Sequence, residues 1–222
     1  MALKAIIFDL DGVIVDTAEL HYSAWKRLAD EEGAPFNKEI NESFKGVSRQ
    51  ACVRILFPNV ESEERLAFLA EKKNSYYVDM IENLKPENLL PGVYNFIREV
   101  KRENIRTGIG SVSKNTRKVL EKLQVTDMFD AVVDGTLIKN SKPAPDVFIL
   151  CAKLLEVDPK YCIVIEDAEA GIEAAHAAGI IAIGRGSAYV LRNADYVVES
   201  IEELNLDKLK ALLLLEALKR AE

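Results

Sequence analysis

Cysteine and histidine are scarce in this chain. Its 222 residues include only 3 cysteines and 2 histidines, His21 and His176. The odd set of thiols, Cys52, Cys151 and Cys162, lacks metal-binding or redox spacing and does not suggest a disulfide framework. Nothing pairs the two histidines as ligands of a catalytic zinc. We therefore expect buried thiols in a reducing cytosol and no zinc chemistry.

A basic surplus and a long apolar run are missing as well. The net charge is −7, with both signs interspersed, whereas proteins that bind a nucleic-acid backbone usually carry excess positive charge. No apolar stretch approaches the roughly 20 residues of a membrane helix. A core strand is expected to begin close behind Met1, which leaves no visible signal peptide. We expect a cytoplasmic protein with no nucleic acid and no membrane as partner.

The first clear apolar pattern lies near the N-terminus. Hydrophobic residues make up 49% of the chain, enough for a packed interior. Residues 5–8 form an unbroken apolar run, typical of a strand buried on both faces of a parallel sheet, and the run ends at an acidic turn containing Gly12. Asp9 and Asp11 would lie at the carboxyl end of that strand, where open α/β sheets bind ligands. The alternative is that both aspartates serve only the turn.

Helical patterns fill the next segment, and helices then alternate with strands. Residues 17–83 contain no convincing strand and are expected to form several helices. Alternation of strands with helices implies βαβ crossovers and a parallel sheet. The expected strands are 106–111, 131–134, 161–167, 180–184 and 195–198, and the expected helices between them are 92–103, 114–124, 145–156 and 169–178.

These patterns predict an α/β fold with an all-helical insertion. The expected domains are core residues 1–16, a helical cap at 17–88 and the remaining core at 89–222. Ser48 is an expected N-cap, and Gly33 and Gly179 are expected at helix ends. A terminal helix at 204–218 is expected to dock its leucine run, residues 213–215, on the core.

Further polar residues follow the later strands, so they would meet Asp9 at the same edge of the sheet. Ser111 ends the run at 106–111, and Ser113, Lys114 and Asn115 follow at a predicted helix start. Hydroxyls, backbone N–H groups and a helix N-terminus favour an anion such as phosphate. The alternative is that Ser113 only caps the helix.

Lys142 and an acidic pair complete the polar set. Lys142 precedes Pro143, which disfavours the helical conformation for Lys142, so a stiff, extended backbone would aim its ammonium group. A solvated loop lysine is the alternative. Glu166 and Asp167 close another apolar run. Together with Asp9 they form an oxygen-ligand set suited to Mg²⁺.

Four motifs of the haloacid dehalogenase-like superfamily of phosphotransferases occur in order along the chain: residues 8–13, Ser111, Lys142, and Glu166 with Asp167. The chain resembles this superfamily over essentially its whole length, which implies a Rossmann-like core with a helical cap inserted after the first strand. The resemblance also implies that Asp9 is the nucleophile that becomes an aspartyl-phosphate and that Asp11 is the general acid/base. Ser111 and Lys142 would hold the transferring phosphoryl group.

The same resemblance implies a Mg²⁺ site. Asp9 and Asp167 would supply carboxylate ligands, and the backbone carbonyl of Asp11 would supply another. Glu166 would support the bound waters.

The cap decides whether a phosphoenzyme passes its phosphoryl group to water or to a second hydroxyl. Here the cap resembles that of the hexose-phosphate mutases of the superfamily, which interconvert β-D-glucose 1-phosphate and glucose 6-phosphate through glucose 1,6-bisphosphate. A monomer acting on a small-molecule hexose phosphate is then expected. The substrate-binding residues implied are Thr17, His21, Trp25, Gly46, Val47, Ser48, Arg49, Lys73, Ser113, Lys114 and Asn115.

The resemblance gives the cap residues separate roles. Arg49 would grip the second phosphate of a bisphosphate with its planar fork, and Trp25 would contact the sugar. His21 would link Asp11 to Lys73 once the sugar closes the cap, which excludes water. The structural alternatives are a core position for Trp25, solvated positions for Arg49 and Lys73, and a helix-surface position for His21.

Two other functions are compatible with a phosphorylated aspartate. One is a sugar-phosphate phosphatase of the same superfamily, and the other is a phospho-aspartate signalling receiver, against which the helical cap counts. Three residues depart from the mutase pattern. Phe44 and Cys52 stand where Leu and Ser are expected, and Gly110 stands where Ala is usual, which would alter sugar selectivity or loop mobility.

Overall fold

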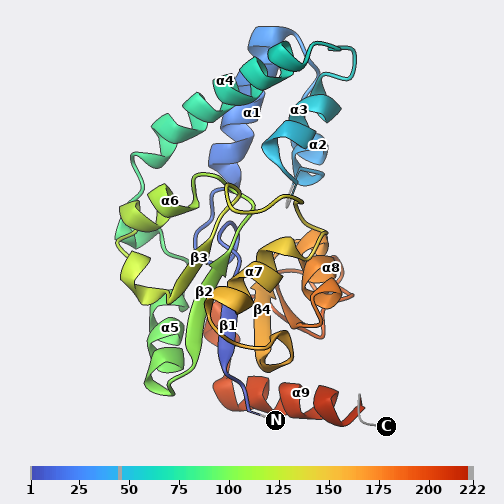
Figure 1. Ribbon diagram of the computed structural model, residues 1–222. Helices are drawn as coiled ribbons and strands as arrows, with labels where there is room; N and C mark the ends of the chain where they lie inside the picture. Colours follow the sequence, from blue (N-terminus) through green and yellow to red (C-terminus); the bar gives the residue numbers. More distant parts are fainter. Residues whose placement is uncertain (1, 45–46, 220–222) are drawn as a thin grey trace.

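The core of the protein is a parallel six-stranded sheet in a computed structural model that describes residues 2–44 and 47–219 (Figure 1). The strand order is β3-β2-β1-β4-β5-β6, so β1 lies in the middle, with Ala5 paired to Arg106 on one side and to Cys162 on the other. This order is that of a Rossmann-like sheet, as expected from the sequence. The strands are β1 (Ala5–Phe8), β2 (Arg106–Gly110), β3 (Ala131–Val133), β4 (Cys162–Glu166), β5 (Ile181–Arg185) and β6 (Tyr196–Val198).

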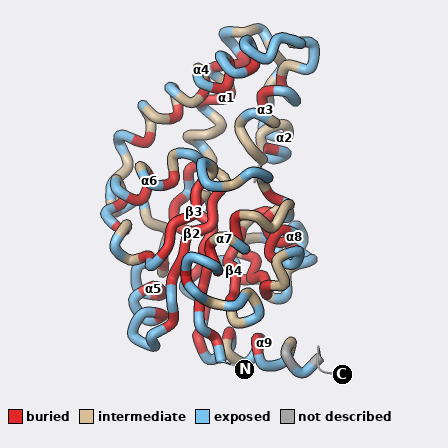
Figure 2. The backbone as a smooth tube through the Cα atoms, in the orientation of Figure 1, coloured by how far each residue is buried: buried red, intermediate tan, exposed pale blue. Residues whose placement is uncertain are grey.

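Two hydrophobic cores lie on opposite faces of this sheet. The helices that cover it are α5 (Val93–Arg102), α6 (Thr116–Lys122), α7 (Asp146–Leu154), α8 (Glu169–Ala177) and α9 (Leu206–Lys219). Ile6 and Phe8 face the core beneath α5, α6 and α9, whereas Ala5 and Ile7 face the core beneath α7 and α8. Figure 2 shows the central strands as continuously buried chain. Burial on both faces explains why β1 is apolar at every position.

The inserted segment forms a separate helical layer above the carboxyl edge of the sheet (Figure 1). Its helices are α1 (Ala18–Glu32), α2 (Lys38–Glu42), α3 (Arg49–Leu56) and α4 (Glu63–Ile81). Trp25, Phe44, Val53 and Leu69 belong to a hydrophobic cluster of its own. The all-helical insertion expected from the sequence is therefore confirmed.

The two chain segments that join the insertion to the sheet run side by side. Val15 forms a bridge with Leu89, and the amide of Leu90 donates to the carbonyl of Ile14 at 3.0 Å. The two segments that connect the insertion to the sheet are thus hydrogen-bonded to each other. We propose domain boundaries after residues 16 and 88, which makes residues 17–88 the cap.

Helix ends follow local chemistry. The Ser48 hydroxyl accepts a hydrogen bond from the amide of Ala51 at 3.3 Å and caps α3. Gly33 and Gly179, at φ +70° and +74°, occupy left-handed positions at the ends of α1 and α8. These predicted ends are confirmed. Short 3-10 turns are present as well, at Pro86–Asn88, Thr126–Met128, Pro159–Tyr161 and Ile201–Glu203.

Two predictions about helices need correction. The helix expected from residue 114 begins at Thr116, and Ser113 does not cap it, because its hydroxyl accepts from the amide of Asn115 at 3.2 Å in a turn before the helix. In α9 only Leu213 of the leucine run is buried, whereas Leu214 and Leu215 are exposed. Successive residues point about 100° apart around a helix, so three adjacent leucines cannot all face one core.

None of the helices in the described ranges combines the length and the hydrophobicity that crossing a membrane requires.

The three cysteines provide a test of the packing. Cys52, Cys151 and Cys162 are buried free thiols. Burial raises the pKa of Cys52 and of Cys162 to about 12 and raises that of Cys151 further. Because only the thiolate is nucleophilic, we expect native protein at neutral pH to resist a chromogenic aromatic disulfide, and denatured protein to release three equivalents of thiolate. Rapid reaction of native protein would contradict this packing.

Candidate active site

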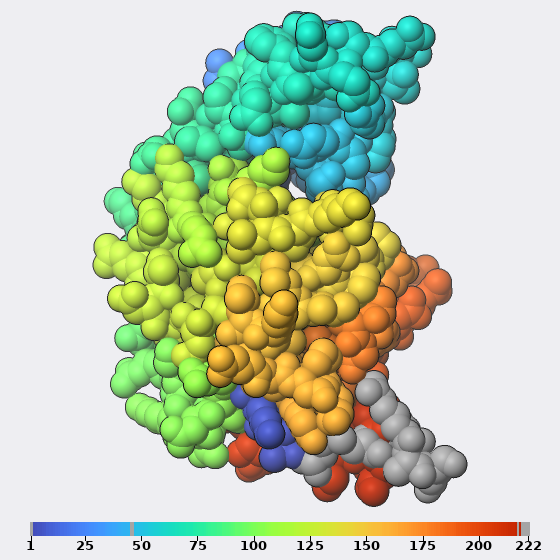
Figure 3. All heavy atoms as spheres, viewed as in Figure 1, coloured from blue at the N-terminus to red at the C-terminus, as the bar shows by residue number. Residues whose placement is uncertain are grey.

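A pocket of about 530 Å³ lies between the carboxyl edge of the sheet and the cap. Figure 3 shows the hollow in the outline of the molecule where the cap meets the core. Asp9, Ser111 and Glu166 line the pocket from the core, and Trp25 and Arg49 line it from the cap. The pocket therefore collects side chains that are far apart in the sequence.

Lys142 lies between two buried carboxylates. Its Nζ is 2.5 Å from Asp9 Oδ1 and 2.6 Å from Glu166 Oε1, and its side chain is only 1% exposed. A solvated lysine is therefore the wrong interpretation. Burial alone lowers the pKa of Lys142, but the two carboxylates raise it above its ordinary value. The ammonium stays charged and fixes the position of Asp9.

Asp9 continues the line of β1 into the pocket. Its amide donates to the carbonyl of Ile165 at 2.9 Å, which extends the sheet by one residue. Burial raises the pKa of Asp9 to about 7, Lys142 opposes that rise, and the carboxylates of Glu166 and Asp11 add to it. This crowding of like charges marks a place where a cation would bind favourably.

Three carboxylates can supply oxygen ligands to one cation. Oxygen atoms of Asp9, Glu166 and Asp167 all lie within 4.8 Å of one another. Such a set fits Mg²⁺, which prefers hard oxygen ligands. The other oxygen of Glu166 accepts from the amide of Ala168 at 2.7 Å, and a Cβ at Gly171 would come within 1.8 Å of Glu166 Oε1. Glu166 is thus held from two sides.

The turn after Asp9 contacts the same cluster. Gly12 has φ +77°, a left-handed conformation that favours glycine. A Cβ at Gly12 would lie 2.0 Å from Asp167 Oδ2. The absence of a side chain at residue 12 therefore lets the turn approach Asp167 closely.

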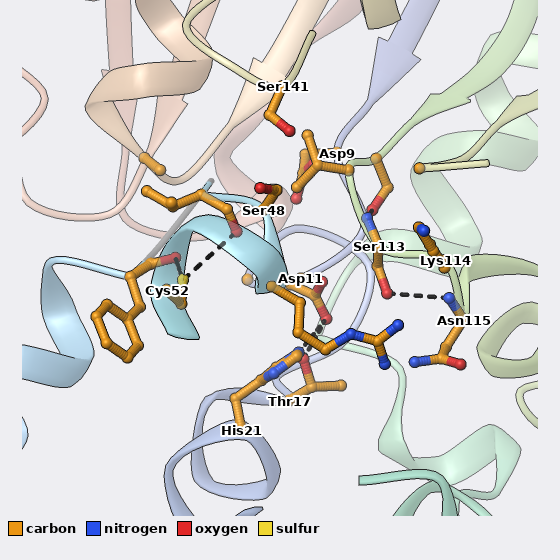
Figure 4. Close-up of a pocket in the computed structure, with 18 of the residues that line it drawn as sticks. Asp9, Asp11, Thr17, His21, Ser48, Cys52, Ser113, Lys114, Asn115 and Ser141 are labelled. Atoms are coloured by element: carbon orange, nitrogen blue, oxygen red, sulfur yellow. Dashed lines mark hydrogen bonds and ion pairs between the residues drawn. The ribbon is translucent and has the colours of Figure 1, made fainter. Parts of the chain in front are cut away.

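Asp11 faces a chain of cap residues (Figure 4). The hydroxyl of Thr17 donates to Asp11 Oδ1, and Nε2 of His21 lies 3.9 Å from the same oxygen. Nδ1 of His21 is 2.8 Å from Nζ of Lys73. When Lys73 is protonated, its ammonium can only donate, so Nδ1 is then the acceptor and the ring proton is on Nε2, which faces Asp11.

Burial shifts the pKa values of Asp11, His21 and Lys73. The pKa of Asp11 is raised mainly by burial. Burial, and then the cations Lys73 and Arg49, lower the pKa of His21 well below its ordinary value, so the ring is neutral. Burial and Arg49 also lower the pKa of Lys73 to about 7. Lys73 is 3% exposed, so the solvated alternative is wrong for Lys73. The side chain of His21 is 31% exposed on α1 and lines the pocket.

An aromatic pair encloses the Lys73 ammonium. Its Nζ lies 4.8 Å from the ring centroid of Trp25 and 4.9 Å from that of Tyr77, and the rings of His21 and Tyr77 stack at 4.1 Å. Trp25 is 3% exposed and belongs to the cap core, yet it also lines the pocket. The two interpretations of Trp25 are therefore compatible.

A loop after β2 forms the opposite wall. The amide of Ser113 donates to the hydroxyl of Ser111 at 3.1 Å, and the side-chain amide of Asn115 donates to Asn74 of α4 at 2.9 Å. Lys114 is exposed at the same wall. The loop combines hydroxyls, amides and a cation, and it touches the cap directly.

Arg49 enters the pocket from the start of α3. Its side chain is 16% exposed and pairs with Glu71 at 3.0 Å, so the solvated alternative is wrong for Arg49. Val47 and Ser48 line the pocket beside it. Gly46, which was predicted with them, lies outside the described residues.

Several residues that line the pocket were not predicted from the sequence, among them Tyr77 and Arg185. Tyr77 lies four residues after Lys73, on the same face of α4. Arg185 is the last residue of β5. The signal for Arg185 was present, because it directly follows the apolar run at 180–184 and so lies at the carboxyl edge of the sheet. The departures Phe44 and Cys52 also line the pocket.

Comparison with known families agrees with this geometry. The family model described as haloacid dehalogenase-like hydrolase matches residues 6–184. The chain belongs to this family. The match covers β1 from Ile6 onward, the cap and all the pocket residues named above except Arg185.

Similar proteins in this family carry two kinds of name. A β-phosphoglucomutase of Bacillus subtilis is 42% identical over 216 residues, covering 93% of this chain and 94% of the relative. A phosphatase of phosphorylated carbohydrates from Thermotoga maritima is 33% identical and covers 80% of this chain and 82% of its own. The crystal structure of a β-phosphoglucomutase from Clostridium difficile has a TM-score of 0.93 at 39% identity, covering 98% of this chain and 100% of its own.

The contact between Gly12 and Asp167 can be tested by substitution. Gly12→Ala should lower the free energy of unfolding by more than the roughly 1–3 kcal/mol of left-handed strain, because Asp167 must also move. Gly179→Ala is the matched control, since Gly179 has φ +74° and nothing within 4 Å of an added Cβ. Urea unfolding monitored by circular dichroism measures both. Equal losses would show that Asp167 does not press on residue 12.

Proposed function

We propose that the protein is a β-phosphoglucomutase, an isomerase that interconverts β-D-glucose 1-phosphate and glucose 6-phosphate through an aspartyl-phosphate and glucose 1,6-bisphosphate. Three cap residues carry the proposal: His21, Lys73 and Arg49 face Asp9 and Asp11 across one pocket. The 42% identity to the Bacillus subtilis enzyme and the TM-score of 0.93 with the Clostridium difficile enzyme support the same function.

In the first half-reaction Asp9 acts as the nucleophile. A carboxylate oxygen of Asp9 attacks the phosphorus, and the bond between phosphorus and the sugar oxygen breaks. Asp11 donates a proton to that departing oxygen, and burial, which raises the pKa of Asp11, favours the protonated form that a general acid needs. Lys142 and Ser111 hold oxygens of the phosphoryl group in transit.

In the second half-reaction the roles of Asp11 reverse. Asp11 accepts the proton of another sugar hydroxyl, whose oxygen attacks the phosphorus of the aspartyl-phosphate, and the bond to Asp9 breaks. His21, anchored by Lys73, orients Asp11 toward the sugar. A bisphosphate that turns end for end needs two phosphate sites, and Arg49 with Ser113 and Asn115 would provide the distal one.

Mg²⁺ is part of this proposal. Asp9, Asp167 and the carbonyl of Asp11 would hold the ion, and Glu166 would orient its waters. When bound, Mg²⁺ would neutralise charge on the transferring phosphoryl group. The cytoplasmic location and the monomeric state expected from the sequence stay predictions.

A phosphatase is the second candidate, because the Thermotoga maritima relative carries that name. In that case the aspartyl-phosphate passes to water, and Asp11 activates the water. A signalling receiver is disfavoured, because a receiver needs no substrate pocket shared between a core and a cap.

The product of the reaction decides between these functions. We expect the protein, given β-glucose 1-phosphate, Mg²⁺ and trace glucose 1,6-bisphosphate, to form glucose 6-phosphate much faster than inorganic phosphate, and excess chelator to stop both. Asp9→Asn should abolish both reactions and the acid-stable phosphoryl label while leaving the circular dichroism spectrum unchanged. Faster release of inorganic phosphate would establish the phosphatase instead.

The distal phosphate site gives a second test. Arg49→Ala should lower the rate of glucose 1-phosphate conversion roughly 10- to 100-fold, since a charge-assisted hydrogen bond contributes about 1.5–3 kcal/mol. Labelling of Asp9 by acetyl phosphate should persist, because that small donor does not need the distal site. Arg49→Lys should restore part of the rate, as it returns the charge without the planar fork.

The matched control is Arg54→Ala. Arg54 lies on the same helix but is exposed and paired with Glu63, so its loss should leave both measurements unchanged. If Arg49→Ala behaves like Arg54→Ala, Arg49 does not bind the distal phosphate.

A further inference from the structure

Arg185 reaches from β5 to the turn that carries Asp11. Its Nη1 donates to the carbonyl of Gly12 at 3.1 Å, although β4 separates β5 from β1, the strand that precedes the Gly12 turn. Arg185 follows Gly184, which pairs with Glu166 in the sheet. Its backbone is therefore fixed beside the acidic cluster, and its side chain spans the distance to the Gly12 turn.

The contact is made at a cost in stability. The Nε of Arg185 is buried, and no acceptor among the described residues hydrogen-bonds to it. An unsatisfied buried donor costs about 1–3 kcal/mol. Stability alone therefore does not account for arginine at residue 185, and an unpaired buried group of this kind points to a role in function.

The hydrogen bond from Arg185 restrains the Gly12 turn. The amide of Gly12 donates to the carbonyl of Val15 at 2.8 Å, and its Cα is pressed toward Asp167. Arg185 holds the remaining free polar group of Gly12, its carbonyl. With both polar groups of Gly12 engaged, the turn cannot rotate without breaking a hydrogen bond. The carbonyl of Asp11 belongs to the preceding peptide, so the same two hydrogen bonds restrict its movement relative to Asp167.

We propose that Arg185 is a positioning residue for the metal site, which it serves by holding the Gly12 turn against Asp167. This inference rests on the proposed function, in which the carbonyl of Asp11 and the carboxylate of Asp167 bind one Mg²⁺. Outer contacts of this type typically change metal affinity 10- to 100-fold when they are removed.

The direction in which metal affinity changes when Arg185 is replaced distinguishes a positioning role from a purely electrostatic one. Arg185 is a cation beside a cation site, so removal of its charge alone would strengthen metal binding by relieving repulsion. Loss of positioning has the opposite effect, because the two ligands are then no longer held at the required separation. Weaker binding after removal of the positive charge therefore identifies the positioning role.

The experiment uses Mn²⁺ as a probe, since it prefers the same oxygen ligands and its free form is measured by electron paramagnetic resonance. We expect Arg185→Met to weaken Mn²⁺ binding roughly 10- to 100-fold and Arg185→Lys to weaken it by less. Mg²⁺ should displace the bound Mn²⁺ in all proteins. Because Arg185→Lys keeps the charge, it remains informative even if Arg185→Met does not fold.

The control for a merely structural role is Arg117→Met. Arg117 also donates to a backbone carbonyl, that of Val132, at 3.1 Å, but it does not line the pocket. The Arg117→Met substitution should lower the melting temperature of the protein without changing its Mn²⁺ affinity. Equal or tighter Mn²⁺ binding by both Arg185 variants would overturn the positioning role while leaving the proposed function intact. No binding of Mn²⁺ by the wild-type protein would overturn the metal site itself, and the inference with it.

Discussion

The ammonium of Lys142, shared between Asp9 and Glu166, is the interaction on which the site depends. All three groups are almost fully buried, and burial of charge is costly unless each charge is paired. The pairing is possible only because β1 and β4 are neighbours, which places Asp9 and Glu166 side by side at one edge. The parallel sheet thus does more than form a core: it sets the distance between two carboxylates that one cation must satisfy.

The cap adds a second charged layer over the first. The core contributes mainly carboxylates, at Asp9, Asp11 and Asp167, whereas the cap contributes Arg49 and Lys73. A phosphate dianion between the two layers would be attracted by the cap and, once a divalent cation is bound, by the core as well. With opposite charge on the two sides of the pocket, an anionic substrate would draw the cap toward the sheet.

The periodicity of apolar residues along the sequence predicted the strands and the polar residues that follow them. An apolar run such as residues 5–8 identifies a strand that is buried on both faces. Because the carboxyl ends of parallel strands share one edge of the sheet, the residues that follow the strands are expected together, namely Asp9, Ser111, Glu166 and Lys142. The start of α6 was misplaced, because the turn at Ser113 uses the same hydroxyl chemistry as a helix cap. The stacking of Tyr77 on His21 depends on how α1 packs against α4, and no local pattern encodes that packing.

Coupling between the two layers follows from how Asp11 is held. Thr17 and His21 contact its side chain from the cap, while Arg185 holds the adjacent Gly12 turn from the sheet. The side chain of Asp11 is therefore held from the cap, whereas its backbone is held from the sheet through the Gly12 turn. In the proposed reaction, an acid/base side chain that turns on a fixed backbone would serve two sugar oxygens in succession, and it would meet the second one after the cap has opened and closed again. Under the proposed function, this division of the two supports would suit a mutase, which transfers to a second sugar oxygen, more than a phosphatase, which transfers to water.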